Sequence, residues 1–82
     1  MMKYKCFCCG FRTLEHNPED PTLEICPVCF WGNDPLQNEK PDYLGGANDL
    51  SLNQSKINYQ RFNAVEERFI KYVRKPLPEE TI

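Results

Sequence analysis

The sequence predicts a small α+β domain that a bound metal ion stabilises. The chain has 82 residues, of which five are cysteines. A chain of this size buries only about 60% of the surface that it exposes when unfolded, so its hydrophobic core needs an additional source of stability. Four of the cysteines form two CxxC pairs between residues 6 and 29, where strand-like alternation dominates, and a helical period appears from Leu52 onward. The pairs predict the metal, and the two periods predict the mixed fold class.

Composition and charge exclude several classes of protein. No stretch approaches the ~20 apolar residues of a membrane span, and Met1–Phe7 lacks the apolar run of a signal peptide. We therefore expect a cytoplasmic protein without membrane association, in a compartment where cysteines act as metal or redox ligands. Residues 1–50 carry four Lys/Arg against eight Asp/Glu, and residues 51–82 carry six against four. The acidic first half argues against a general polyanion binder but leaves a local basic face open.

The N-terminal part of the chain predicts a β-hairpin or a three-strand ribbon. Residues 3–31 contain all five cysteines, and alternation within them can place Tyr4 and Cys6 on one face of a strand. Two prolines and an Asn/Asp cluster in residues 15–21 are typical of a loop. We expect the turns of this ribbon to be built around the cysteines.

The cysteines form a CxxC-x16-CxxC pattern, in which Cys6 pairs with Cys9 and Cys26 pairs with Cys29. Two intervening residues let a tight turn direct both sulfurs to one point, and Gly10 supplies the positive φ that such a turn favours. Two turns at this separation complete a tetrahedral site of four thiolates, within the zinc-ribbon range of spacings. Four thiolates leave no open coordination position, so the sequence predicts one structural Zn²⁺ and no catalytic water.

Other uses of these cysteines remain open. Iron in a rubredoxin-like site uses similar turns. A thiol–disulfide enzyme could use the second pair, but that mechanism favours a cysteine at a helix N-terminus, and residues 30–35 are poor helix material. We expect no other enzyme activity. Cys8 is expected to point away from the metal as a spectator, and His16 to be solvated in its polar loop rather than to bind the ion.

Residues 32–50 predict a long loop, because glycines and prolines leave no periodic run. A loop of this length is uncommon in a compact domain, so it is either ordered against the cysteine module or carries a function. The candidate partner-binding residues are polar or aromatic and lie in or beside this loop: Trp31, Asp34, Asp42 and Asn48. The competing interpretation has Trp31 covering the metal site and the polar residues forming turns.

From Leu52 onward the hydrophobic period is that of an amphipathic helix. Ser51 is the expected N-cap, with Gln54 as its capping-box partner, although Asp49 could cap the helix instead. The apolar residues of one face are Tyr59, Phe62, Val65, Phe69 and Val73. Asn63 is expected to break the helix in a left-handed conformation, so that a second helical piece starts near Glu66.

Basic side chains collect on the opposite side of this helical segment, and the candidates for nucleic-acid binding among them are Arg61, Arg68, Lys71, Arg74 and Lys75. The competing interpretation is a solvated helix face. We expect residues 1–75 to form a single zinc-ribbon-like domain with a C-terminal helical segment, and residues 76–82 to be a flexible tail.

Stretches around both cysteine pairs carry a resemblance to a known family: Tyr4-Lys5-Cys6, Cys8-Cys9-Gly10, and Glu24 to Trp31. Further matching stretches are Asp34-Pro35, Gln37, Pro41-Asp42, Gly45-Gly46-Ala47-Asn48, Ser51-Leu52-Asn53, Glu66-Glu67-Arg68-Phe69 and Tyr72 to Pro76. The chain resembles the small bacterial proteins of the CPCC cysteine-rich family over nearly its whole length. Phe7 stands where the family name has proline, which reduces the rigidity of the first turn without touching the ligands. The resemblance implies one metal-binding unit and no particular activity.

Without catalytic apparatus, the chain is expected to be a non-catalytic protein-interaction module. We expect a monomer that binds another protein, for example as an immunity protein that neutralises a toxin. Nucleic-acid binding through the basic face is the alternative, and thiol redox chemistry is a third.

Overall fold

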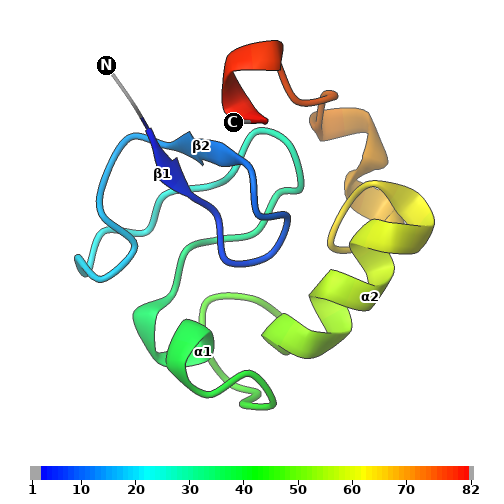
Figure 1. The fold of residues 1–82 in the computed structure, drawn as a ribbon. Helices are drawn as coiled ribbons and strands as arrows, with labels where there is room; N and C mark the ends of the chain where they lie inside the picture. Colours follow the sequence, from blue (N-terminus) through cyan, green and yellow to red (C-terminus); the bar gives the residue numbers. More distant parts are fainter. Residues whose placement is uncertain (1–2, 82) are drawn as a thin grey trace.

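The computed structural model describes residues 3–81, so Met1, Met2 and Ile82 of the predicted domain and tail lie outside the described residues. The elements follow in the order β1 (Tyr4–Lys5), β2 (Arg12–Leu14), α1 (Pro35–Glu39), α2 (Leu52–Phe62), and the 3₁₀ helices η1 (Glu67–Tyr72) and η2 (Pro78–Glu80). Figure 1 shows the two strands at one side of the molecule and α2 at the other, with the chain between them passing through α1. None of the described helices is long and apolar enough to span a membrane.

The N-terminal ribbon is a two-strand antiparallel hairpin. Tyr4 pairs with Leu14, and the register shifts at the next residue of β1. Of the two forms that the sequence predicts, the hairpin is therefore confirmed, and the three-strand ribbon is wrong for residues 3–81. Ile25 makes only an isolated antiparallel bridge, to Gly32.

A glutamate side chain binds the backbone at the end of the hairpin. The carboxylate of Glu24 accepts hydrogen bonds from the backbone N–H groups of Glu15 at 2.6 Å and His16 at 3.0 Å. These donors follow β2 directly. A side chain therefore completes the hydrogen bonding at the end of the hairpin.

The predicted loop over residues 32–50 contains a short helix, α1, that the sequence interpretation missed. Asp34 caps it, because its carboxylate accepts from the N–H groups of Leu36 at 2.9 Å and Gln37 at 3.3 Å. Pro35 occupies the first helical position, where a missing N–H has no consequence. An aspartate followed by proline is a helix-start signal, but five residues are too few for a helical period to show.

The rest of this loop is ordered around the buried side chain of Gln37. Its Nε2 donates to the carbonyl oxygens of Tyr43 and Leu50, each at 3.2 Å. Its Oε1 accepts from the backbone N–H of Asn48 at 3.1 Å and from that residue's Nδ2 at 2.8 Å. A Cβ at Gly46 would lie only 2.6 Å from the Gln37 side chain, so glycine is required there. Of the two predicted alternatives, the structure supports an ordered loop.

The helix α2 begins and breaks where the sequence predicts. The Ser51 hydroxyl accepts from the N–H of Gln54 at 3.1 Å, which confirms the N-cap. Gln54 does not complete the capping box, since its Nε2 donates to Oδ1 of Asn58 at 2.9 Å. Asn63 follows α2 with φ of 61°, which confirms the left-handed break. The chain then continues as the 3₁₀ helix η1, so the predicted apolar face is not one continuous helical stripe.

The hydrophobic core lies between the two cysteine turns and α2. Its buried members are Cys6, Cys8, Leu14, Cys26, Val28, Cys29, Trp31, Leu52 and Val65. Most of them come from the two cysteine turns and the residues beside them, so the core and the sulfur site are the same part of the molecule.

The C-terminal segment differs from the frayed tail that the sequence predicts. Helix η2 contacts β2 (Figure 1), and the Glu80 side chain is buried. Both oxygens of its carboxylate accept from the guanidinium of Arg74, at 2.9 and 2.8 Å. A bidentate pair of this kind fixes geometry as well as adding energy, so residues 78–80 are attached to the domain. Sequence composition alone does not reveal a partner of this kind.

Replacing Glu80 with glutamine is expected to lower the free energy of unfolding at pH 7 by about 1–2 kcal/mol, because a charged hydrogen-bonded pair becomes a neutral one. Glu79→Gln, at an exposed position on the same helix, should leave it unchanged. Arg74 holds the pKa of Glu80 below its usual range. The contribution is therefore complete above the unfolded pKa of about 4.3 and is lost as pH falls through the lower folded value. Equal effects of the two substitutions in chemical denaturation would contradict the attachment.

Candidate metal centre

The first cysteine turn is closed by two backbone hydrogen bonds. The N–H of Cys6 donates to the carbonyl oxygen of Phe11 at 2.9 Å, and the N–H of Gly10 donates to that of Cys6 at 2.9 Å. Gly10 has φ of +81°, as the sequence predicts for this position. These bonds hold Cys6 and Cys9 in one tight turn.

The second cysteine turn repeats this pattern of hydrogen bonds. The N–H of Cys26 donates to the carbonyl oxygen of Trp31 at 2.9 Å, and the N–H of Phe30 donates to that of Cys26 at 2.9 Å. Phe30 has φ of 74°, where the first turn has Gly10. A left-handed conformation costs a non-glycine residue about 1–2 kcal/mol. The Phe30 ring packs at 4.5 Å from that of Phe69, and this contact joins the turn to η1.

The turns bring together the four cysteines that the sequence predicts as ligands. The Sγ atoms of Cys6, Cys9, Cys26 and Cys29 all lie within 4.8 Å of one another. Two of the separations are 3.6 Å, between Cys6 and Cys29, and 3.7 Å, between Cys9 and Cys26. A Zn–S bond of about 2.3 Å gives a tetrahedron with an edge of about 3.8 Å. The cysteines are free thiols, and their arrangement fits one tetrahedral metal ion.

Hydrogen-bond donors point at two of these sulfurs. The N–H of Val28 donates to Sγ of Cys26, and the N–H of Trp31 donates to Sγ of Cys29, each at 3.4 Å. The Thr13 hydroxyl lies 3.0 Å from Sγ of Cys26, where it can donate to a thiolate. Such donors stabilise negative charge on sulfur and orient the ligands. Sequence reasoning missed Thr13, because a threonine in a short strand gives no signal of its partner.

The sulfurs cannot all ionise without a cation. Hydrogen bonding with Cys26, together with burial, raises the pKa of Cys6, Cys9 and Cys29 above the usual range. Hydrogen bonds from the other three thiols lower the pKa of Cys26, so that one thiolate is favoured within the group. A divalent ion holds all its thiol ligands deprotonated. Metal binding by this site therefore releases protons and becomes stronger as pH rises.

Cys8 and His16 lie outside the group of four. Cys8 is buried, and after Cys26 and Cys6 its thiol is a further neighbour that raises the pKa of Cys29. His16 is exposed and places Nδ1 3.2 Å from the Glu24 carboxylate. The structure thus places Cys8 beside the metal centre and His16 away from it.

Cys8→Ser is expected to retain one metal ion per chain, because the four sulfurs that meet at the site remain. Cys9→Ser is expected to lose the ion or bind it more weakly by orders of magnitude, because only three thiolates are left. Metal content after gel filtration measures both. Loss of metal from the Cys8 variant with retention in the Cys9 variant would reverse the assignment of the ligand.

Trp31 is not available as a partner-binding residue, which corrects one of the predicted assignments. Its side chain is fully buried, and its Nε1 donates to Oδ1 of Asn38 at 3.0 Å. Asn38 in turn donates through Nδ2 to Oδ1 of Asn33 at 2.8 Å. The interpretation that Trp31 covers the metal site agrees with its place in the core beside the ligand cysteines.

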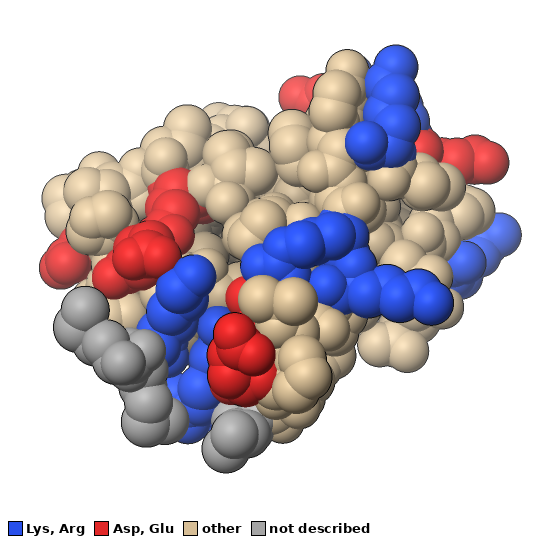
Figure 2. Space-filling model, turned by 90° about the horizontal axis from the view of Figure 1, so that it is seen from above, with Lys and Arg blue, Asp and Glu red and all other residues tan. Residues whose placement is uncertain are grey.

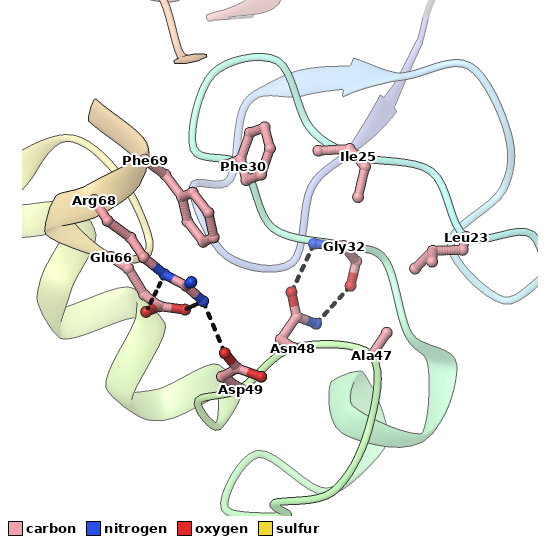
Figure 3. Close-up of a pocket in the computed structure, with 10 residues that line it drawn as sticks. All are labelled: Leu23, Ile25, Phe30, Gly32, Ala47, Asn48, Asp49, Glu66, Arg68 and Phe69. Atoms are coloured by element: carbon pink, nitrogen blue, oxygen red, sulfur yellow. Dashed lines mark hydrogen bonds and ion pairs between the residues drawn. The ribbon is translucent and has the colours of Figure 1, made fainter. Parts of the chain in front are cut away.

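Two of the other three candidates hold the long loop together. Asp34 caps α1. Asn48 forms two hydrogen bonds with the backbone of Gly32 (Figure 3). Its Oδ1 accepts from the Gly32 N–H at 2.8 Å, and its Nδ2 donates to the Gly32 carbonyl oxygen at 2.7 Å. Asp42 is exposed and accepts from Nδ2 of Asn53 at 2.8 Å. Asp34 and Asn48 therefore have internal roles, and Asp42 remains on the surface.

Carboxylates engage two of the five candidate basic residues. Arg68 lies 2.7 Å from Asp49 and 3.0 Å from Glu66, and Arg74 pairs with Glu80. Arg68 lines a hollow of about 150 Å³. Figure 3 shows its side chain next to Phe69. The helix break also separates the basic residues between α2 and the segment after it, so they do not form the continuous stripe that the sequence predicts.

The other three basic candidates are arranged differently. The Arg61 guanidinium lies 5.1 Å from the centroid of the Phe62 ring, and the Lys71 amine lies 5.3 Å from that of Tyr72. Lys75 forms no ion pair with any residue in the described range 3–81. Figure 2 shows Lys and Arg side chains across the middle of one face of the molecule. The chain thus carries local positive charge despite its net charge of −2.

Comparison with known proteins adds one result to this geometry. A family model described as "Cysteine-rich CPCC" matches residues 4–80, a range that spans both cysteine turns and the helices that follow. No curated protein matches the chain significantly.

Proposed function

The chain belongs to the cysteine-rich CPCC family, and we propose that it is a zinc-binding, non-catalytic module that recognises another protein. The observation that carries the proposal is the group of four cysteine sulfurs, all within 4.8 Å of one another. Because four thiolates fill a tetrahedral coordination sphere, no position on the ion is open to water or substrate. A closed site supports a structural role for the metal.

Zinc is the proposed ion, with iron as the alternative. Both accept tetrahedral thiolate ligands, and metal availability decides between them in many proteins. The burial of Cys6, Cys26 and Cys29, each at most 1% exposed, suits an ion that holds the fold together. Protein purified without an affinity metal should contain one zinc per chain and show no visible colour. A red protein would identify iron and overturn the zinc assignment.

Recognition of another protein is the proposed role of the surface that the metal stabilises. We propose that the protein acts as a cytoplasmic monomer. The closed metal site supports a role without catalysis, and an ordered loop on a rigid scaffold is a common place for binding residues. Asp42 is the exposed member of the candidates in that loop.

Nucleic-acid binding is the second candidate, and one observation favours it: Arg61, Lys71 and Lys75 keep their charges outside ion pairs among residues 3–81. The nucleic-acid hypothesis is weakened by the ion pairs of Arg68 with Asp49 and of Arg74 with Glu80.

A binding comparison tests the proposed role. The zinc-loaded protein is expected to co-purify from its source with one protein in fixed stoichiometry, and the purified pair should reassemble. It should show no binding to single- or double-stranded oligonucleotides at micromolar concentration. Oligonucleotide binding that falls steeply with salt would favour the nucleic-acid alternative. Turnover in a disulfide-reduction assay would favour thiol redox chemistry, and absence of any partner would contradict the proposal.

A further inference from the structure

A groove of about 660 Å³ lies where the first cysteine turn meets the C-terminal part of the chain. Its walls come from three places in the sequence: Phe11 after the first turn, the end of α2, and the segment from Ile70 to Pro76. The left-handed residue Asn63 creates this arrangement, because it ends α2 and turns the chain away into η1. The volume is within the range of about 300–1,000 Å³ that is typical of binding pockets.

Apolar side chains line part of the groove, together with the polar side chains of Gln60 and Asn63. Phe11, Tyr59 and Phe62 contribute partly buried rings, and Ile70 is 46% exposed. Apolar side chains gathered in a hollow at the surface mark an interaction site more often than isolated exposed ones do.

The charge at the groove is positive. None of the residues that line it is an aspartate or a glutamate. Lys75 lines it without an ion pair among residues 3–81, and Arg61 lies over the Phe62 ring, which forms part of the wall. Arg74 also lines the groove, but its guanidinium is held by Glu80. Two cations therefore remain to attract an anionic group.

We propose that this basic groove, formed by Phe11, Tyr59, Phe62, Ile70, Val73 and Lys75, binds a short acidic segment of a partner protein in which a large apolar side chain stands next to Asp or Glu. The apolar side chain covers Ile70 and Val73, and the carboxylate lies near Lys75 and Arg61. The inference rests on the proposed protein-recognition function and specifies the surface and the chemistry of the partner.

The aliphatic part of the wall favours a peptide over nucleic acid. Single-stranded nucleic acid is held by stacking of bases on aromatic side chains, together with a basic track along the backbone. Here the three aromatic rings are partly buried, whereas Ile70 supplies exposed aliphatic surface. Arg74 is neutralised by Glu80. An apolar side chain beside a carboxylate uses both the aliphatic surface and the two isolated cations.

Selection from a library of phage-displayed random 12-residue peptides on the immobilised zinc-loaded protein tests this inference. The selected peptides should place Asp or Glu beside Leu, Ile, Phe or Trp. Lys75→Glu is expected to lower the affinity for a selected, labelled peptide about tenfold. Raised salt should lower the affinity further, because the charges are exposed. Lys56→Glu, at an exposed position of α2 outside the groove, should leave the affinity unchanged. One zinc per chain in each variant shows that the fold is retained.

Several results would overturn the assignment of the basic groove as a peptide-binding site. They are selected peptides without acidic residues, equal effects of Lys75→Glu and Lys56→Glu, no enrichment at all, competition by an oligothymidylate, or a dimer in sedimentation that occludes the groove. If the co-purified protein still binds the Lys75 variant with unchanged affinity, the protein-recognition function stands and the groove assignment falls. If no protein partner binds the unsubstituted protein or the Lys75 variant, the protein-recognition function and the groove assignment are both wrong.

Discussion

Complete removal of the metal is expected to unfold the domain. Among the described residues, three of the nine buried core members, Cys6, Cys26 and Cys29, belong to the group of four cysteines. The fourth, Cys9, packs against this core, and the four sulfurs meet at the site. In small zinc peptides the ion contributes about 10–16 kcal/mol to folding. A whole small domain has a stability of about 5–15 kcal/mol, so the metal-free chain should have no stable fold. A strong chelator should abolish the dispersion of the amide NMR spectrum and the near-ultraviolet signal of Trp31.

Re-addition of zinc provides the control for this prediction. It should restore the spectrum under reducing conditions, and the Cys8→Ser protein should lose and regain its fold in the same way. A fully metal-free protein that keeps a dispersed spectrum would show that the core is stable by itself. The structural role of the ion would then be wrong.

Trp31→Ala is expected to lower the free energy of unfolding of the zinc-loaded protein by about 3–5 kcal/mol. Trp31 is the largest of the fully buried side chains, and its removal leaves a cavity beside the ligand cysteines. It also leaves Oδ1 of Asn38 without its donor. Trp31→Phe keeps most of the ring volume, so its free energy of unfolding should fall by less. The unpaired Oδ1 of Asn38 should account for about 1–3 kcal/mol of that decrease.

Leu44→Ala is the matched control for the tryptophan variants. Leu44 is 63% exposed, and a substitution at such a position changes stability by no more than about 0.5 kcal/mol. Chemical denaturation in excess zinc measures all three variants. A Trp31→Ala protein as stable as the Leu44 variant would contradict the place of Trp31 in the core.

The cysteine pattern could be interpreted from the sequence because its geometry is local. The two residues between paired cysteines determine the direction of both side chains. The CxxC pattern therefore predicted which four sulfurs lie together. The N-cap at Ser51 and the break at Asn63 were predictable for the same reason, since each depends on the conformation of a few adjacent residues.

Features that depend on distant partners were missed. Gln37 is a polar residue, and its burial becomes favourable only when Tyr43, Asn48 and Leu50 supply its hydrogen bonds. The tail is attached through a pair between Arg74 and Glu80 that composition does not reveal. The same limit applies to Trp31, which sequence alone allowed either on the surface or in the core.

The two cysteine turns each contain a residue with positive φ at the same position, Gly10 in the first turn and Phe30 in the second. Phe30 and Gly10 occupy the same place, four residues after the first cysteine of each turn. The sequence indicated the left-handed residue only where it was glycine. Aligning the two turns on their cysteines would have indicated it in both, and would have suggested that the Phe30 side chain has a packing partner.

The proposed site holds one zinc ion by four cysteine thiolates and by no other ligand. X-ray absorption at the zinc edge of the purified protein tests it most directly, because the fine structure reports the type, number and distance of the ligand atoms. The predicted result is four sulfur neighbours at about 2.3 Å and no nitrogen or oxygen neighbour. A shell with three sulfurs and a nitrogen or oxygen at about 2.0–2.1 Å would contradict it.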